Sequence, residues 1–467
     1  MMGGYYSSKA SRLRFAPPST HLWVLGGIAL LLAGACQMAR SALHFIPALF
    51  ISLGRCAAGA LLVACSAAVV AVVVWLALPP ECHIRHLVRR GLFCPSFGNP
   101  LHLKDGELLP PVSCTAVKVE GGYRRYILTI RAKCRTVEEI KALASFISST
   151  LTGRFRNYIV NKIEVDESFN HIDFFLEDAT IDKRMVVHDV EDMRSASPTI
   201  LAVQQGTTID LATSGSMIVA GKTRSGKTTG IISLLLQVLS WGPDKYGSRV
   251  LVIDPKQAEL SRLPTVVTID EDGGARAILA AMRDFAALIT RRQAILNEMS
   301  EKSGDAVHWW SAGMHVSILF IDEFVACRTL FPKRAEKDEP GYCLAEFDAL
   351  LKRIVTMGAS AGCYAVISIA EASVEEGGLP AMLRSAMSTK ILFRPTMPEA
   401  RLLWSSDKLE TMLERTYGPG DAWFSSTDGV HDEVSLVRFP RMEFPAYKEL
   451  GRLLLAYGSN PTDTPSD

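Results

Sequence analysis

Two long apolar stretches open the chain, residues 22–38 and residues 59–78, and the second is dense in alanine, valine and leucine. A helix needs about twenty apolar residues to cross the hydrocarbon core of a bilayer. We therefore expect a hairpin of two transmembrane helices near the N-terminus. For the first stretch a cleavable signal peptide is the alternative, but the second stretch follows so soon that a hairpin is the simpler interpretation.

Basic residues surround this hairpin unevenly. Three precede the first stretch and three follow the second: Lys9, Arg12, Arg14, Arg85, Arg89 and Arg90. The connecting loop is expected to hold only Arg40 and Arg55. Because cytoplasmic flanks carry the excess of lysine and arginine, both ends of the hairpin are expected in the cytoplasm. The rest of the chain would then be cytoplasmic and anchored to the plasma membrane.

Beyond the hairpin, the pattern changes to short strands around one helix. "RRYILTI", "NKIEVDE" and "IDFFLED" are typical of strands. Thr136 and Glu139 have the spacing of a capping box, and Gly153 suits the end of the helix that they open. That helix places five apolar side chains on one face: Ile140, Leu143, Ala144, Ile147 and Leu151. The pattern predicts a small α+β domain.

The second half of the chain alternates buried strands with helices. "SMIVA", "RVLVID", "VSILFI" and "CYAVISI" are apolar runs without polar alternation, and an amphipathic helix spans residues 275–297. Such strands are covered on both faces, which indicates a parallel sheet with helices on either side. The expected fold class is therefore α/β.

A glycine-rich loop joins the first of these strands to a helix. Gly221, Gly226, Lys227 and Thr228 have the spacing G-x-x-x-x-G-K-[ST] of a P-loop. Glycines let the backbone N–H groups point at phosphate oxygens, and the helix that opens at Thr228 adds its partial positive charge. A glycine-rich surface turn is the alternative. The residues expected to bind the nucleotide are Gly221, Lys222, Thr223, Arg224, Ser225, Gly226, Lys227, Thr228 and Thr229.

A P-loop predicts an acidic partner at the end of a later strand. Asp322 follows the apolar run of residues 316–321, at the edge of the sheet where ligands bind. We expect Thr228 and Asp322 to hold Mg²⁺, Lys227 to reach the phosphates of ATP, and Glu323 to polarise the attacking water. The alternative is that Asp322 and Glu323 only cap the next helix. Together the two motifs favour nucleotide hydrolysis.

These patterns divide the chain into six segments. They are a cytoplasmic tail (1–20), a transmembrane hairpin (21–80), a linker (81–112), the small α+β domain (113–197), a P-loop ATPase domain (198–440), and a C-terminal helix with a disordered tail (441–467).

The net charge and the cysteines of the chain do not by themselves indicate a binding partner, a metal or a disulfide framework. The formal net charge is +1, so a nucleic-acid contact would need a local basic patch. The ten cysteines show no paired spacing that would indicate zinc or a disulfide framework. The candidate patch is "RTLFPKRAEK", with Arg328, Lys333, Arg334 and Lys337, and the alternative is a solvated loop whose charge is offset by Glu336, Asp338 and Glu339.

The motifs in this order resemble the FtsK/SpoIIIE family of DNA translocases. After the P-loop come "VLVIDPKQAEL", "ITRRQAIL", "LFIDEF", "GASAGCYAVISIAEAS" and "GPGDAWF". The box formed by Asp254, Lys256, Glu259 and Leu260 is more specific than the P-loop alone. The resemblance implies a RecA-like motor, a homohexameric ring around double-stranded DNA, and ATP bound between subunits. It also places Arg353 where an arginine of the family could act across that interface; an exposed helical arginine is the alternative.

The chain also departs from the family. Where the family usually has "ATQRPS" after the fourth strand, this chain has "SIAEAS", with Ala370 and Glu371 in place of glutamine and arginine. The two spans and the short linker resemble the shorter members encoded by conjugative elements of Gram-positive bacteria, which move element DNA between cells. Alternatives are a type IV coupling protein, a type VII-like secretion ATPase, and a ring that binds nucleotide without turnover.

Overall fold

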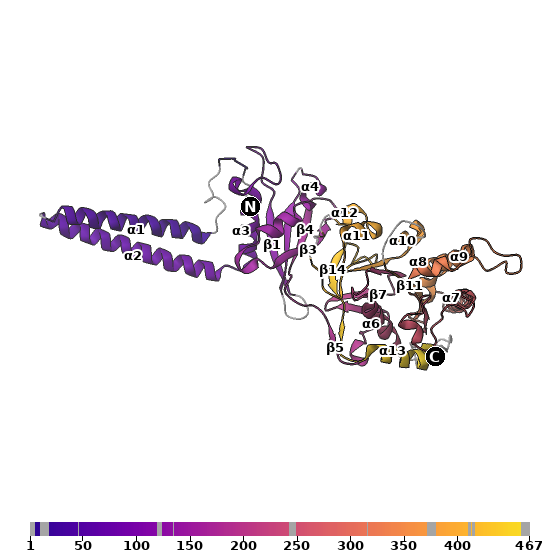
Figure 1. Cartoon of the computed structure of the whole chain (residues 1–467). Coiled ribbons are helices and arrows are strands. Elements are labelled where there is room, and N and C mark those ends of the chain that lie inside the picture. The colour runs from indigo at the N-terminus through magenta and orange to yellow at the C-terminus, as the bar shows by residue number, and fades with distance from the viewer. Residues whose placement is uncertain are drawn as a thin grey trace. The chain divides into compact units, whose positions relative to one another are not determined.

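The computed structural model describes residues 5–9, 18–44, 46–118, 124–133, 135–241, 249–314, 316–370, 380–409, 412 and 416–458. The chain forms two compact units, Met1–Thr180 and Ile181–Asp467. Figure 1 shows the helical hairpin of the first unit in indigo, and the elements of the second unit from magenta to yellow. The polar tail of the chain, expected to be disordered, lies outside the described residues from residue 459 onward.

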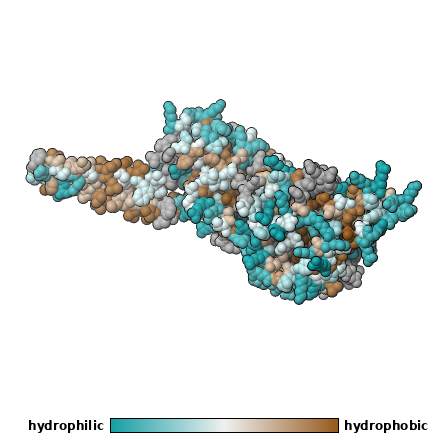
Figure 2. Space-filling model, viewed as in Figure 1, coloured by the Kyte–Doolittle hydropathy of each residue, from teal (hydrophilic) through white to brown (hydrophobic). Residues whose placement is uncertain are grey.

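The N-terminal hairpin consists of α1 (Pro18–Ala42) and α2 (Pro47–Ala77). Both helices are long and apolar enough to cross a membrane, and Figure 2 shows hydrophobic residues along much of their surface. The two helices contact one another as a pair. A Cβ at Gly26 would lie 3.5 Å from the carbonyl oxygen of Ala64, an ordinary contact distance, so the packing of α1 on α2 does not depend on this glycine.

The hairpin corrects the sequence-based loop. Arg40 and Arg55 were assigned to the connection, whereas Arg40 lies in α1 and Arg55 in α2. The helix α2 begins at Pro47, a residue favoured in the first helical turn, rather than near Gly59. The Arg40 guanidinium of α1 lies 4.1 Å from the centre of the Phe50 ring of α2. This cation–π contact joins the two helices.

The rest of the first unit is a four-stranded antiparallel sheet in the order β1-β2-β4-β3. The strands are β1 (Val112–Lys118), β2 (Arg124–Arg131), β3 (Tyr158–Val165) and β4 (His171–Asp178), with helices α3 (Pro80–Phe93), α4 (Val137–Lys141) and α5 (Ala144–Thr150). The predicted cap is confirmed, because the Thr136 side chain accepts a hydrogen bond from the Glu139 N–H. The predicted helix is broken between α4 and α5, yet its apolar face is buried as expected.

One element of this unit was missed. Residues 81–112 were expected to form a linker, whereas residues 80–93 form the helix α3. Ile84, Val88 and Leu92 recur every four residues along α3, and all three are fully buried in the core of the small domain. That spacing is the signal of an amphipathic helix, and the neighbouring Pro and Gly loops had obscured it.

The second unit is built on a seven-stranded sheet in the order β14-β13-β12-β8-β11-β10-β9. Five strands are parallel. Four were predicted, β8 (Met217–Gly221), β9 (Arg249–Ile253), β10 (Ser317–Ile321) and β11 (Cys363–Ile369), and the fifth, β12 (Thr389–Phe393), was not. The strands β13 (Asp421–Ser426) and β14 (Ser435–Arg438) add an antiparallel edge. The carboxyl ends of the five parallel strands therefore meet at one edge of the sheet.

Helices cover both faces of this sheet. One core joins Ile218 and Ala220 of β8 to α7 (Arg276–Ser303) and α9 (Leu344–Met357). The other joins Met217 and Val219 of β8 to α6 (Lys227–Leu239) and α13 (Ala446–Leu453). Because successive side chains of a strand point to opposite faces, the two sets alternate along β8. The fold is the α/β architecture that the apolar strands predicted.

Shorter elements complete the second unit. They are β5 (Val186–Val187), β6 (Ile200–Gln204), β7 (Thr207–Asp210), α8 (Phe324–Thr329), α10 (Ala381–Ala386), α11 (Met397–Leu403), α12 (Ser406–Leu409) and β15 (Arg441–Met442). The strand β5 pairs in parallel with β15, and Val187 and Met193 are buried in the core that contains α6. Residues 181–197, which the sequence-based division gave to the small domain, thus pack with the second unit.

Candidate nucleotide-binding site

The glycine-rich loop connects β8 directly to α6, in the strand–loop–helix order that the motif requires. Gly226 has a φ of 94° and ends the loop one residue before α6. A Cβ at this position would lie 2.5 Å from the backbone nitrogen of Gly420. That nitrogen donates a hydrogen bond to the carbonyl oxygen of Ser225 at 2.9 Å. Only glycine fits at position 226, because of the positive φ and the close approach of the Gly420 backbone. The turn before β13 thus packs against the P-loop and hydrogen-bonds it.

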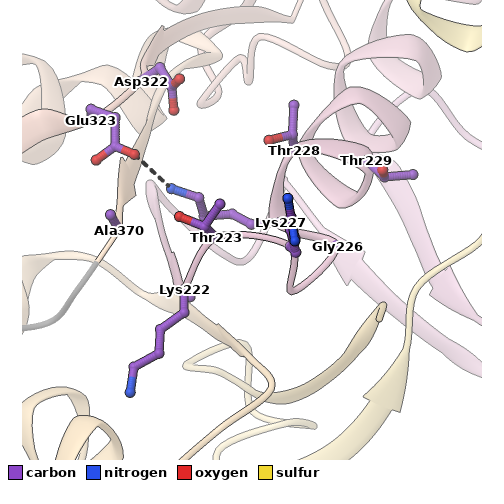
Figure 3. A pocket seen from close by; sticks show the side chains of 11 residues that line it. Lys222, Thr223, Gly226, Lys227, Thr228, Thr229, Asp322, Glu323 and Ala370 are labelled. Atoms are coloured by element: carbon purple, nitrogen blue, oxygen red, sulfur yellow. Dashed lines mark ion pairs between the residues drawn. The ribbon is translucent and has the colours of Figure 1, made fainter. Parts of the chain in front are cut away.

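Lys227 is the first residue of α6 and is almost completely buried. Its Nζ donates a hydrogen bond to Ser368 Oγ at 2.8 Å and lies 3.5 Å from Glu323 Oε1 (Figure 3). Ser368 lies on β11, the strand between β8 and β10, and also hydrogen-bonds Asp322. Sequence reasoning missed Ser368, although it begins the "SIAEAS" segment. The order of the strands, rather than a spacing along the chain, brings it between the lysine and the acidic pair.

Asp322 follows the last residue of β10 and shares the cavity with Lys227. Burial raises the pKa of Asp322, while the charge of Lys227 and the hydrogen bond from Ser368 act in the opposite direction. A divalent cation beside this carboxylate would favour its ionised form. Thr228 adds a hydroxyl to the same cavity. A carboxylate and a hydroxyl are hard oxygen ligands of the kind that Mg²⁺ takes together with phosphate oxygens.

Glu323 has an unusual backbone for a residue with a side chain. Its φ is 45° and its ψ is 60°, in the left-handed region. Such strain costs on the order of 1–3 kcal/mol and is concentrated at functional sites. Its carboxylate lies between two lysines, with Oε1 3.5 Å from Lys227 Nζ and 3.3 Å from Lys256 Nζ. The strained turn thus directs an acidic group toward the lysine of the P-loop.

Lys256 belongs to the loop after β9, and a fully buried carboxylate fixes that loop. Asp254 accepts hydrogen bonds from the backbone N–H groups of Lys256, Ala258 and Ser261, each at 3.0 Å. Since β9 and β10 are neighbours in register, this loop ends beside Glu323. The sequence had singled out Asp254 and Lys256 as a motif without giving them a role in the site.

The P-loop cavity has a volume of about 240 Å³ and gathers most of the expected residues. Its lining is Gly221, Lys222, Thr223, Arg224, Gly226, Lys227, Thr228, Thr229, Asp322, Glu323 and Ala370. The Lys222 side chain points away from Glu323 (Figure 3), and its Nζ lies 3.7 Å from Glu399 Oε1. Among the expected loop residues, Ser225 is buried behind the cavity.

Two expected positions lie elsewhere. Arg353 is on α9, where its Nη2 donates a hydrogen bond to Thr290 Oγ1 at 2.6 Å on an exposed surface. It is absent from the lining of the P-loop cavity of its own chain. Glu371, the second departure from the family pattern, lies outside the described residues. A role of Arg353 across a subunit interface stays a prediction.

The strand, the glycine-rich loop, the buried lysine and the acidic pair on a nearby strand define a P-loop NTPase. Residues 186–326 match the model of the FtsK/SpoIIIE family. The chain therefore carries a domain of the FtsK/SpoIIIE family.

Curated relatives agree with this assignment. The DNA translocase FtsK of Helicobacter pylori strain J99 is 24% identical over 246 residues, which are 50% of this chain and 27% of that protein. The FtsK of H. pylori strain 26695 is also 24% identical over 246 residues, covering 50% of this chain and 26% of the relative. The chain thus matches about a quarter of the length of these relatives.

Solved structures with a similar chain trace include the pCW3 conjugation coupling protein TcpA with ATPγS, at a TM-score of 0.45 and 14% identity. The similarity covers 74% of this chain and 93% of TcpA. EssC from Geobacillus thermodenitrificans, ATPases 2 and 3, has a TM-score of 0.40 and 16% identity. There the similarity covers 61% of this chain and 54% of EssC.

Proposed function

We propose that the protein is a membrane-anchored, ATP-driven DNA translocase. The observation that carries this proposal is the convergence of Lys227, Thr228, Asp322 and Glu323 on one cavity within an FtsK/SpoIIIE domain. A scaffold that only binds nucleotide would not need an acidic residue held in a strained turn beside the lysine. In a hydrolysing enzyme, that residue would orient the attacking water.

In the proposed reaction, Lys227 leaves Ser368 and Glu323 and places its charge on the β- and γ-phosphates of ATP. Thr228 and Asp322 would hold a Mg²⁺ ion, which would supply positive charge beside the phosphates. Glu323, freed from Lys227, accepts a hydrogen bond from the attacking water and orients it. The backbone N–H groups of the P-loop and the start of α6 support the remaining phosphate oxygens.

The membrane anchor is proposed from α1 and α2. Both are apolar over a sufficient length, and basic residues dominate the flanks of the pair. Positive flanks favour the cytoplasm, which would place the ATPase domain on the side where ATP is present. A topology reporter inserted after His44 should give an outside signal, and one inserted after Arg90 an inside signal.

The proposed DNA contact lies on the loop between α8 and α9. Lys333, Arg334 and Lys337 are exposed on this loop. Arg328, also a candidate, is engaged elsewhere, because its Nε and Nη2 donate to the Asp348 carboxylate at 2.9 and 2.7 Å. Glu339 pairs with Arg276 at 2.8 Å, which leaves less acidic charge to offset the loop. The candidate contact is therefore narrower than the sequence indicated.

The finer proposal is a homohexameric ring around double-stranded DNA that moves the DNA of a conjugative element between cells. In a ring, each exposed cation of this loop would be repeated by the number of subunits. Contacts with phosphates rather than base edges suit a motor that must pass over any sequence. This part of the proposal rests on the resemblance to the short members of the family.

The test is ATP turnover of the full-length protein in detergent, with and without DNA. We expect turnover to rise when linear double-stranded DNA is added. The affinity for DNA should fall linearly on a log–log plot with salt, because lysine and arginine side chains that bind phosphates release counterions from the DNA. A rate of ATP turnover that does not change when DNA is added would contradict the translocase proposal and favour a secretion ATPase. Nucleotide binding without turnover would favour the scaffold.

A further inference from the structure

The turn that precedes β13 has the sequence GPGD, residues 418–421, and takes no part in the proposed reaction. On one side it touches the P-loop, and on the other it touches residues 181–184, where the second unit begins. We call residues 181–184 the entry segment. We propose that the GPGD turn couples nucleotide binding to the entry segment, with Asp421 as the positioning residue between them. This inference rests on the proposed function and adds regulation to its site.

The GPGD turn contacts the P-loop through its backbone. The Gly420 N–H donates a hydrogen bond to the Ser225 carbonyl, and the Gly420 carbonyl accepts one from the Phe439 N–H, both at 2.9 Å. Gly420 has a φ of 87°, in the region that favours glycine. A Cβ at Gly226 would lie 3.3 Å from the carbonyl carbon of Pro419. Because the two backbones are already in close contact, a shift of the P-loop has to move the turn.

Asp421 fixes the other side of the turn. Its Oδ2 accepts a hydrogen bond from the Gly418 N–H at 2.9 Å. Its Oδ1 lies 3.1 Å from Arg184 Nη2 and 3.5 Å from Arg438 Nε. Only 13% of the Asp421 side chain is exposed, and water and salt screen partly buried pairs less than open surface pairs. One carboxylate thus holds both the turn and two arginines.

The two arginines reach the entry segment. Arg184 belongs to it, and its Nη2 also donates a hydrogen bond to the Pro419 carbonyl at 3.2 Å. Arg438, the last residue of β14, donates from Nη1 to the Ile181 carbonyl at 2.9 Å. The second unit begins at Ile181, so the chain joins this network as soon as it leaves the first unit. The entry segment is therefore held to the GPGD turn by charged groups.

These contacts give a direction to the coupling. Phosphates bind a P-loop through its backbone N–H groups, so a bound nucleotide shifts or stiffens the loop. The hydrogen bond between Gly420 and Ser225 passes this change to the turn, and Asp421 passes it to Arg184. Coupling between two sites is reciprocal. The state of the chain where it enters the second unit therefore alters the affinity for nucleotide by the same factor.

The test is hydrogen exchange of the full-length protein in detergent, measured by mass spectrometry with and without ATPγS. In the wild type, ATPγS should slow exchange both in the P-loop and in the entry segment. Asp421→Asn keeps the size of the side chain and removes its charge. In this variant ATPγS should still protect the P-loop but not the entry segment, and its calorimetric affinity should fall about fivefold, at the low end of measured couplings.

A second variant keeps the test valid if Asp421→Asn folds poorly. Arg184→Met should also abolish the response of the entry segment, whereas Arg184→Lys retains the charge and should retain most of the response. The quantity compared is the difference that ATPγS makes, because a merely loosened network raises exchange in both states. Asp182→Asn is the matched control. That carboxylate is 64% exposed and 3.5 Å from Arg438 Nη1, so its loss should change the affinity by less than about twofold.

The outcomes separate this inference from the proposed function. The coupling is overturned if ATPγS binds the wild type without changing exchange in the entry segment, or if the response survives in both Asp421→Asn and Arg184→Met. Either result leaves the P-loop assignment standing. A wild-type protein that does not bind ATPγS would overturn the proposed function and the coupling with it.

Discussion

Two cavities meet at Thr229, the P-loop cavity and a second cavity along α6, and they are built in different ways. The P-loop cavity takes eight of its eleven lining residues from the single stretch of residues 221–229. The second cavity takes its eight residues from α6, from the loop after β9 and from the segment that follows the sheet. Phosphate recognition needs backbone N–H groups in sequence, so it is local in the chain. The second cavity needs opposing walls from separate elements, so it depends on tertiary packing.

This difference predicts that single substitutions in the P-loop cavity lower ATP turnover more than substitutions elsewhere in the unit. Lys227→Ala should lower the turnover of ATP by on the order of 10²–10³, because phosphoryl transfer depends on charge stabilisation. The measurement is steady-state ATPase activity of the full-length protein. The matched control is Lys222→Ala, in the same loop but paired with Glu399, which should cost no more than a few-fold. Equal losses in the two variants would contradict the roles given to these lysines.

Glu323→Gln should separate binding from hydrolysis within the same cavity. The amide keeps the size of the side chain but cannot orient water as a carboxylate does, so turnover should fall by on the order of 10². The affinity for ATP should stay within a few-fold of the wild type, as measured by calorimetry with Mg²⁺ present. Near-normal turnover in this variant would show that another residue orients the attacking water.

Lys256 tests how far the P-loop cavity depends on a residue outside its own stretch. Lys256→Met removes the cation 3.3 Å from Glu323 Oε1. Once Lys227 turns to the phosphates, Lys256 is the remaining lysine beside that carboxylate, and without it Glu323 is less well positioned. We expect a three- to tenfold lower kcat with little change in KM, a modest effect because the pair is partly exposed to solvent.

The control for this prediction is Lys256→Arg, which retains the charge and should recover most of the wild-type kcat. Thermal unfolding of both variants checks that the loop after β9 stays folded. An unchanged kcat in Lys256→Met would show that Glu323 is positioned without this lysine.

The smallest expected effect on basal turnover is at the exposed loop between α8 and α9. Changing Lys333 and Arg334 to Ala should lower DNA-stimulated turnover and reduce the slope of log affinity against log salt by about one for each lost phosphate contact. Basal turnover should not change. Lys302→Ala removes an exposed cation of α7 and serves as the control for net charge. An unchanged slope in the double variant would place the DNA contact elsewhere.

The contrast between the cavities also explains what the sequence could predict. The P-loop spacing, the acidic pair after an apolar strand and the cap at Thr136 are local patterns, and the structure forms the expected strand, loop and helix around each. Proximity between strands is not local. Ser368 and Lys256 reach Lys227 and Glu323 only because β11 and β9 lie on either side of β10.

Three other features escaped the sequence for related reasons. The apolar face of α3 was present in the spacing of Ile84, Val88 and Leu92, but the surrounding turn residues indicated a linker. Arg55 was placed in a loop because a charge interrupts an apolar run, whereas α2 continues through it. The hydrogen bond from Tyr447 to the Glu259 carbonyl could not be predicted, because it joins residues 188 positions apart in the chain.

The central claim is that nucleotide hydrolysis in this unit moves the protein along DNA. Displacement of a fluorescent triplex-forming oligonucleotide from a linear duplex by the full-length protein measures such movement directly. The account predicts displacement with ATP and Mg²⁺, and none with a non-hydrolysable analogue or in Glu323→Gln. Vigorous ATP turnover in the presence of DNA without any displacement of the third strand would contradict it.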